Sequence, residues 1–171
     1  MSILLMIAIL AAFMPLENTY AASKTGFEYG NIKIAVKTKY QVKLLDKNGK
    51  LIPASDVTWK TADKSIAKIN KKGMLSGVKK GKTKVIAKYK GKTYKTTVRV
   101  YKFDIKKLKK SFGIPSKVKV KVKKEEVYYW WEAQAWMVPV QISLTDGTPI
   151  ASADCEVTSP DIMKNIWVNK N

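Results

Sequence analysis

The side chains with which enzymes usually perform acid, base or nucleophilic chemistry are scarce in this sequence of 171 residues. It contains no histidine, which removes the usual general base, the common zinc ligand and any nucleophile that histidine would activate. Its one cysteine, Cys155, can build neither a thiolate metal site nor an intramolecular disulfide. Small and apolar residues alternate around it, and this pattern predicts a thiol that faces inward and acts as a small apolar side chain.

Carboxylates are the remaining candidates for chemistry. Two of them held roughly 5 to 9 Å apart across a sugar cleft could hydrolyse a glycosidic bond. The C-terminal candidates are Glu125, Glu126, Glu132, Asp146, Asp154, Glu156 and Asp161. A short meander of strands offers little concavity to bury such a pair, and no calcium-binding loop is present. We therefore predict a non-enzymatic protein with no catalytic, metal-binding or cofactor-binding residue.

A stacking site is indicated by the aromatic segment V-Y-Y-W-W-E-A-Q-A-W-M-V. If Val127–Leu144 is one strand, alternation places Tyr128, Trp130 and Trp136 on one face and the other two rings opposite them, where they can meet a helix. An open face would be an aromatic platform for a surface glycan or a partner protein. A face packed on the rest of the chain would be an interface between two domains, and both alternatives remain open.

The whole sequence has a formal net charge of +20. Its positive charge is concentrated in the first two thirds of the chain. Residues 23–101 hold 20 Lys and one Arg against 4 acids, whereas residues 125–171 hold 2 Lys against 7 acids. Such a field attracts polyanions such as anionic cell-wall polymers. Because 32 of the 33 cations are Lys, and Arg is favoured for bidentate recognition, we expect diffuse attraction and no specific nucleic-acid binding. A lysine-biased genome would produce the same pattern, and the sequence does not decide between these alternatives.

The N-terminus resembles a secretory signal. An apolar run, Ile3–Pro15, is too short to span a bilayer but has the length of a signal core. Small residues at Thr19 and Ala21 suit cleavage after Ala21, although no Lys or Arg precedes the run. We therefore predict a signal peptide over residues 1–21, no transmembrane segment in the mature chain, and a secreted or extracellular protein held on the wall without covalent attachment.

The order of strands and turns in Val57–Val100 is typical of a two-sheet sandwich, with Trp59 as a plug between the sheets. The segment resembles the bacterial Ig-like domain, group 2. The positions that carry the resemblance are Trp59, Asp63, Ser65, Ile66, Ala67, Ile69, Gly73, Leu75, Gly77, Gly81, Thr83, Val85 and Ala87. Such domains are spacers and binding modules of bacterial surfaces and secreted proteins. We expect the sandwich over residues 22–101, with a core that includes Trp59, Ile66, Ile69, Leu75, Val85, Val98 and Val100.

Residues 102–171 predict a small α+β domain. Asp104 can cap a helix over residues 104–112, in which Ile105, Leu108 and Phe112 share one face. Antiparallel strands are expected at 117–123, 127–144, 150–157 and 162–168, with turns at 145–148 and 159–161. The order of elements loosely resembles a PepSY-type domain, with Asp146-Gly147 and Asp154 on its pattern.

The sequence thus predicts a mainly β protein, an Ig-like β-sandwich followed by a small α+β domain. We expect a secreted, non-enzymatic adhesion or scaffold protein of the cell envelope, held by lysines on anionic wall material. The alternative is a regulator or inhibitor of a secreted enzyme, acting through the PepSY-like part. Neither the ligand nor the oligomeric state can be read from the sequence.

Overall fold

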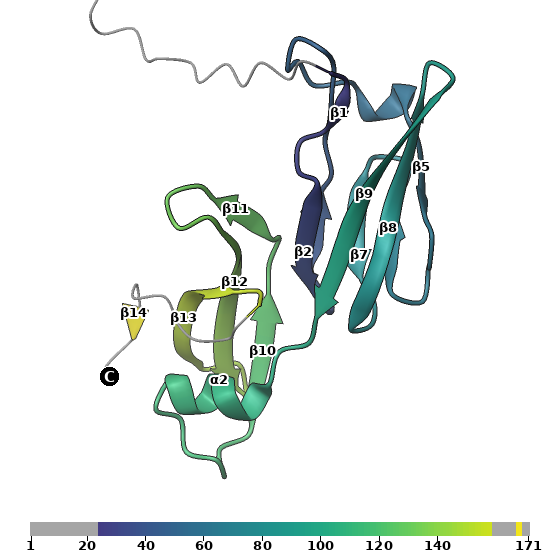
Figure 1. Cartoon of the computed structure of the whole chain (residues 1–171). Coiled ribbons are helices and arrows are strands. Elements are labelled where there is room, and N and C mark those ends of the chain that lie inside the picture. Colours follow the sequence, from purple (N-terminus) through teal and green to yellow (C-terminus); the bar gives the residue numbers. More distant parts are fainter. Residues whose placement is uncertain (1–23, 159–166, 169–171) are drawn as a thin grey trace, which may run out of the picture.

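Two facing sheets form the first part of the chain. The computed structural model describes residues 24–158 and 167–168. One sheet has the strand order β2 (Asn31–Ala35), β9 (Lys92–Tyr101), β8 (Gly81–Tyr89) and β5 (Thr58–Thr61), with β2 parallel to β9 and the other pairs antiparallel (Figure 1). The other has the order β3 (Lys39–Gln41), β7 (Met74–Gly77) and β6 (Ala67–Ile69). At one end β1 (Gly26–Phe27) pairs with β4 (Leu44–Leu45), and a short 3-10 helix, η2, covers Ala54–Asp56. This architecture confirms the predicted Ig-like sandwich.

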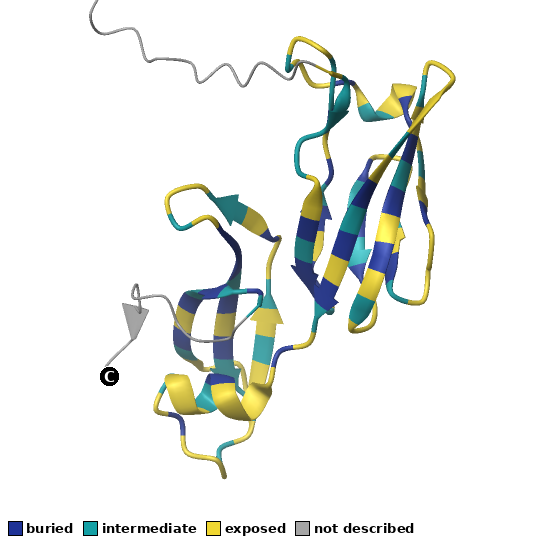
Figure 2. Cartoon of the chain, viewed as in Figure 1, coloured by how far each residue is buried: buried dark blue, intermediate teal, exposed yellow. Residues whose placement is uncertain are grey.

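Alternation along the strands decides which side chains fill the space between the sheets. In β8, Val85 and Ala87 are fully buried, whereas Lys84 and Lys88 are exposed. Figure 2 shows the same bands of buried and exposed residues along β8 and β9. Removal of this apolar surface from water, at about 25 cal/mol per Å², is the main force that holds the two sheets together.

One glycine fixes how closely β7 approaches the end of β2. The N–H of Gly77 donates to the carbonyl of Thr38 at 3.0 Å, and its carbonyl accepts from the N–H of Lys37 at 2.8 Å. A Cβ on Gly77 would lie 2.3 Å from the carbonyl oxygen of Ala35, closer than any side chain tolerates. The backbones can therefore meet here only because residue 77 has no side chain.

The second part of the chain is a helix and an antiparallel sheet, as predicted. The elements are α2 (Ile105–Ser111), β10 (Val120–Lys124), β11 (Tyr128–Trp130), β12 (Ala135–Leu144), β13 (Pro149–Glu156) and β14 (Trp167–Val168). The long strand β12 pairs with β10 and β11 on one side and with β13 on the other, and β14 follows β13. The helix lies at one end of this sheet (Figure 1). The predicted signal peptide, the turn at 159–161 and the start of the last predicted strand lie outside the described residues.

The helix, predicted over residues 104–112, covers Ile105–Ser111, with Asp104 and Phe112 as its caps. The carboxylate of Asp104 accepts hydrogen bonds from the N–H groups of Lys106 (2.9 Å) and Lys107 (3.3 Å), which caps the first turn. Leu108 is fully buried and Phe112 is partly buried against the core. Ile105 is a correction: it was expected on the same face but is 41% exposed, because the core contacts of this two-turn helix lie beyond its first residue.

Candidate binding surfaces

The aromatic segment is a hairpin, which corrects the predicted single strand over residues 127–144. The chain turns back between β11 and β12, so that Tyr129 pairs with Trp136, and Tyr128 pairs with Met137. Gln134 adopts a positive φ of 49° at the end of this turn. Because directly paired residues share a face, Trp136 lies with Tyr129 and not, as predicted, with Tyr128 and Trp130.

Trp136 is the centre of the junction between the sandwich and the C-terminal sheet. Its side chain is only 3% exposed. Its ring centroid lies 5.0 Å from that of Tyr29 and 5.0 Å from that of Tyr40, both sandwich residues, and 5.3 Å from Tyr129. Edge-to-face contacts of this kind stabilise beyond the burial of area. Trp136 is therefore a structural residue of the junction, and the predicted stacking on a ligand does not fit its position.

A backbone hydrogen bond and one half-buried lysine also cross the junction. The N–H of Val127 donates to the carbonyl of Lys39 at 2.8 Å, next to a parallel bridge between Lys39 and Glu126. The ammonium of Lys124 donates to the carbonyl of Val36 at 2.5 Å. Burial, and to a lesser extent the charge of Lys37, lowers the pKa of Lys124. Apolar side chains of both parts belong to one continuous buried cluster.

A groove of about 330 Å³ runs along this junction. Its rim carries two exposed rings, Trp131 (52% exposed) and Tyr128 (37% exposed). Its lining is completed by Glu28, Tyr29, Tyr40, Gln41, Lys43, Glu126, Val127 and Tyr129. The indole N–H of Trp130 donates to the carboxylate of Glu132 at 2.9 Å, outside this lining. Of the three predicted ligand contacts, Tyr128 lines this groove, whereas Trp130 and Trp136 do not.

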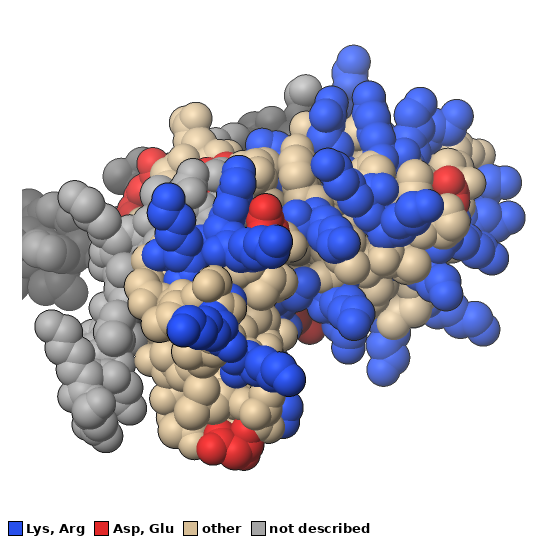
Figure 3. All heavy atoms as spheres, turned by 90° about the horizontal axis from the view of Figure 1, so that it is seen from below, with Lys and Arg blue, Asp and Glu red and all other residues tan. Residues whose placement is uncertain are grey.

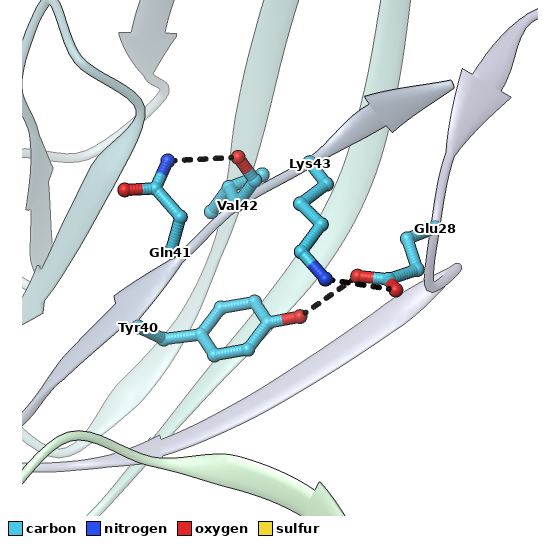
Figure 4. Close-up of polar contacts among 5 residues, drawn as sticks. All are labelled: Glu28, Tyr40, Gln41, Val42 and Lys43. Carbon is cyan, nitrogen blue, oxygen red and sulfur yellow. Dashed lines mark hydrogen bonds and ion pairs between the residues drawn. The ribbon is translucent and has the colours of Figure 1, made fainter. Parts of the chain in front are cut away.

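Glu28 contacts two other polar side chains that line the groove. Figure 4 shows its carboxylate between Tyr40 and Lys43: it accepts from the Tyr40 hydroxyl at 3.4 Å and pairs with the Lys43 ammonium at 3.3 Å. Burial raises the pKa of Tyr40 well above its usual value, and the charge of Glu28 adds to this shift. The phenol therefore stays protonated and donates to the carboxylate.

The outward face of the four-stranded sheet forms a second surface, which we name the basic sheet face. Its cations are Lys33, Lys60, Lys82, Lys84, Lys88, Lys95 and Arg99. All are exposed except Lys33, which is partly exposed. In the view of Figure 3, Lys and Arg side chains crowd the surface of the sandwich, with few acidic side chains between them. Among the described residues, ion pairs join only Lys43 to Glu28 and Lys123 to Glu125, so no carboxylate of that part of the chain neutralises the charge of this face.

The predicted core residues lie at two depths. Leu75, Val85 and Val98 are fully buried and Val100 is 2% exposed. Trp59, Ile66 and Ile69 are partly buried and pack against the core. The indole N–H of Trp59 donates to the carbonyl of Ala54 at 3.2 Å, and its ring lies 6.3 Å from that of Phe27, near one end of the sandwich.

The groups that could carry a reaction do not converge in the described part of the chain. No three His, Cys, Asp or Glu residues there are placed to hold a metal ion. A hollow of about 710 Å³ on the C-terminal sheet has Lys121, Lys123, Gln141 and Ser152 in its lining but none of the described carboxylates. Cys155 is buried, and this burial, with a smaller effect of the Asp154 charge, raises its pKa to about 11. No described helix is both long and apolar enough to pass through a bilayer.

Comparison with known proteins places the sandwich in a family. Residues 32–100 match the family model of the bacterial Ig-like domain (group 2). Curated proteins gave no match to the chain. Among solved structures, domains 4 and 5 of the S-layer protein SbsC are similar at 20% identity and a TM-score of 0.37, over 45% of this chain and 50% of that one. Domains 1–6 of SbsC are similar at 14% identity and a TM-score of 0.39, over 86% of this chain and 25% of that one. The chain thus spans half or less of the length of these two structures.

Proposed function

Because residues 32–100 are a bacterial Ig-like domain of group 2, we propose that the protein is a secreted, non-enzymatic scaffold or adhesion protein of the cell envelope. In this function the sandwich is a rigid carrier, and attraction between its lysines and anionic wall material holds the protein at the surface. The observation that carries the proposal is the basic sheet face, whose seven cations have no carboxylate partner in the described part of the chain.

The surroundings of the charged and aromatic side chains support a binding role rather than a catalytic one. The sequence contains no histidine, and the one thiol is buried with a raised pKa. The exposed rings of Trp131 and Tyr128 lie beside the junction groove, at the edge of a lysine-rich body. A long-range positive potential of this kind raises the local concentration of any anionic polymer.

Binding to isolated bacterial cell walls tests the proposal. The purified protein should sediment with walls at about 50 mM salt and be released at about 500 mM, because exposed charges are screened over about 10 Å at 0.1 M and over less at higher salt. A neutral polysaccharide matrix is the control and should retain none of the protein. Wall binding that is absent at low salt, or that persists unchanged at high salt, would contradict retention by charge.

A further inference from the structure

We propose that the basic sheet face is a docking surface for a linear phosphodiester polymer without bases, with Arg99 in the middle of one of its rows of cations. The inference rests on the proposed function and deepens it, because it names the surface that meets the wall and the chemistry of the polymer. Arg99 is the one arginine of the sequence, and it lies exposed on the second strand of the four-stranded sheet.

The register of the sheet places the cations in rows across the strands. Lys33 of β2 and Lys82 of β8 are both direct partners of Arg99 on β9, which gives a row of three cations. Lys95 of β9 and Lys60 of β5 flank Ile86 in a second row. Neighbours within a row are about 4.8 Å apart between strands, and alternate residues along a strand are about 6.8 Å apart.

These rows are unfavourable for the isolated fold. Like charges directly opposite on a sheet destabilise it, and the four strands contain no Asp or Glu that could offset them. An anion laid between Lys33, Arg99 and Lys82 would reverse the sign of this interaction. Successive rows lie two residues apart along the strands, and each row from Thr93 to Arg99 contains at least one cation. A chain of anions that runs along the strands could therefore meet a new cation at each row.

The other side chains of the face select the kind of polymer. Between the cations lie the hydroxyl and amide groups of Asn31, Thr58, Thr93 and Thr97, with Ile86 half-buried. Tyr101 is the one aromatic residue of the four strands that alternation places on this face, in phase with Lys95 and Arg99. It is partly buried against the core. Bases of single-stranded nucleic acid and sugar rings bind best on exposed aromatic platforms, and stable binding to a membrane surface combines electrostatic attraction with an apolar anchor.

What fits this face is therefore a hydrophilic, acyclic chain with regularly spaced anions, such as a polyol phosphate. Phosphate suits both kinds of cation present. The Arg guanidinium binds it as a planar fork with two hydrogen bonds, and the Lys ammonium binds it as a point charge. The hydroxyls of Thr93 and Thr97 lie on β9 on the same side as Arg99 and can bond the polyol between phosphates.

The decisive experiment compares two variants, each of which loses three positive charges from a different place on the protein. One carries Lys33→Gln, Lys82→Gln and Arg99→Gln on the basic sheet face. The control carries Lys106→Gln, Lys107→Gln and Lys110→Gln, three exposed lysines of α2. The probe is a labelled synthetic glycerol phosphate oligomer, titrated by fluorescence anisotropy at several salt concentrations, and isolated cell walls are tested in parallel.

We expect the sheet-face variant to bind the oligomer at least tenfold more weakly than the control variant. Each lost phosphate contact lowers the slope of log affinity against log salt by about 0.7, so three contacts lower it by about 2, whereas the control slope should stay close to that of the unmodified protein. Circular dichroism checks folding. If the first variant does not fold, Lys84→Gln, Lys88→Gln and Lys95→Gln remove three other cations of the same face.

The outcomes separate the two proposals. Equal losses in the sheet-face and control variants, with wall binding intact in the unmodified protein, overturn the docking surface and leave retention by charge standing. No wall binding by the unmodified protein overturns both. Tighter binding to single-stranded DNA, to polygalacturonate or to phosphatidylglycerol vesicles than to the glycerol phosphate oligomer overturns the proposed polymer chemistry.

Discussion

Trp136→Ala is expected to loosen the junction between the two parts of the chain and to destabilise the whole protein. The ring is almost completely buried and lies within 5.3 Å of three tyrosine rings, two of them from the sandwich. Apolar residues of both parts form one buried cluster around it. The unmodified protein should therefore unfold in a single transition, in which the sandwich and the C-terminal sheet are lost together.

The size of the effect follows from the burial and the ring contacts. Replacing a buried Trp by Ala costs about 3–5 kcal/mol. A well-packed aromatic pair contributes about 0.5–1.5 kcal/mol beyond its buried area, and Trp136 makes three such pairs, so the upper half of that range applies. For a protein of this size, about 2–4 °C in Tm corresponds to 1 kcal/mol, and the variant should melt about 8–16 °C (~4 kcal/mol) lower.

Urea unfolding followed by both fluorescence and circular dichroism provides the measurement. Trp131→Ala is the matched control, because it removes the same side chain from a position that is 52% exposed and touches two rings, Tyr29 and Tyr129, at its edge. It should cost about 1 kcal/mol. A cost for Trp136→Ala below about 1 kcal/mol, or no larger than that of the control, would refute the assignment of this residue to a shared core.

Three further predictions address single residues. Cys155, buried and with its pKa raised to about 11, should not react with iodoacetamide at pH 8 until urea unfolds the protein; labelling of the native protein at the rate of a free thiol would contradict this. Gly77→Ala should destabilise by at least about 1–3 kcal/mol, because the new methyl group meets the Ala35 carbonyl, and an unchanged Tm would show that the backbones can separate freely. Tyr40 has a pKa raised above its usual value near 10, first by burial and then by Glu28, so its contribution to stability is complete below pH ~10 and is lost as the pH rises further. Tyr40→Phe should therefore weaken the alkaline loss of stability, measured as the urea midpoint between pH ~8 and ~11, and an identical decline in both proteins would exclude this role.

The sandwich could be predicted because its signals are local. Alternation in β8 and β9, together with the turn glycines, specifies which side chains face inward wherever one face of a strand is buried. Trp59 shows the limit of this reasoning. Its place on a strand was predicted, but its depth depends on Phe27 and η2, which lie elsewhere in the sequence, and the ring is only partly buried at one end of the sandwich.

The aromatic hairpin could not be predicted from local pattern. Its turn, residues 131–134, contains no Gly, Pro, Asn or Asp, which are the residues that usually mark a reversal of the chain. Gln134 nevertheless adopts the left-handed conformation there. A single strand would place Trp136 on the opposite face from Tyr129, and no local pattern indicates contact with Tyr29, about a hundred positions earlier in the chain. The resemblance of the C-terminal part to a PepSY-type domain stays a prediction.

The rows of the basic sheet face also depend on non-local pairing. The sequence predicted lysines on outer faces, but the parallel pairing of β2 with β9 decides that Lys33 lies beside Arg99. Diffuse attraction was expected because nearly all cations are lysines. The fold places the single arginine between two of them, and the proposed docking surface rests on this arrangement.

The proposed attraction to the wall and the cohesion of the molecule depend on different forces. The two ion pairs of the described residues each lie within one part of the chain, Lys43 with Glu28 and Lys123 with Glu125, and neither crosses the junction. The junction is held by buried rings, by a backbone hydrogen bond and by the half-buried Lys124, all of which salt screens weakly. The exposed basic sheet face, in contrast, is fully open to screening. Raising the salt concentration should therefore detach the protein from an anionic polymer without unfolding it, so that release and loss of structure can be measured separately.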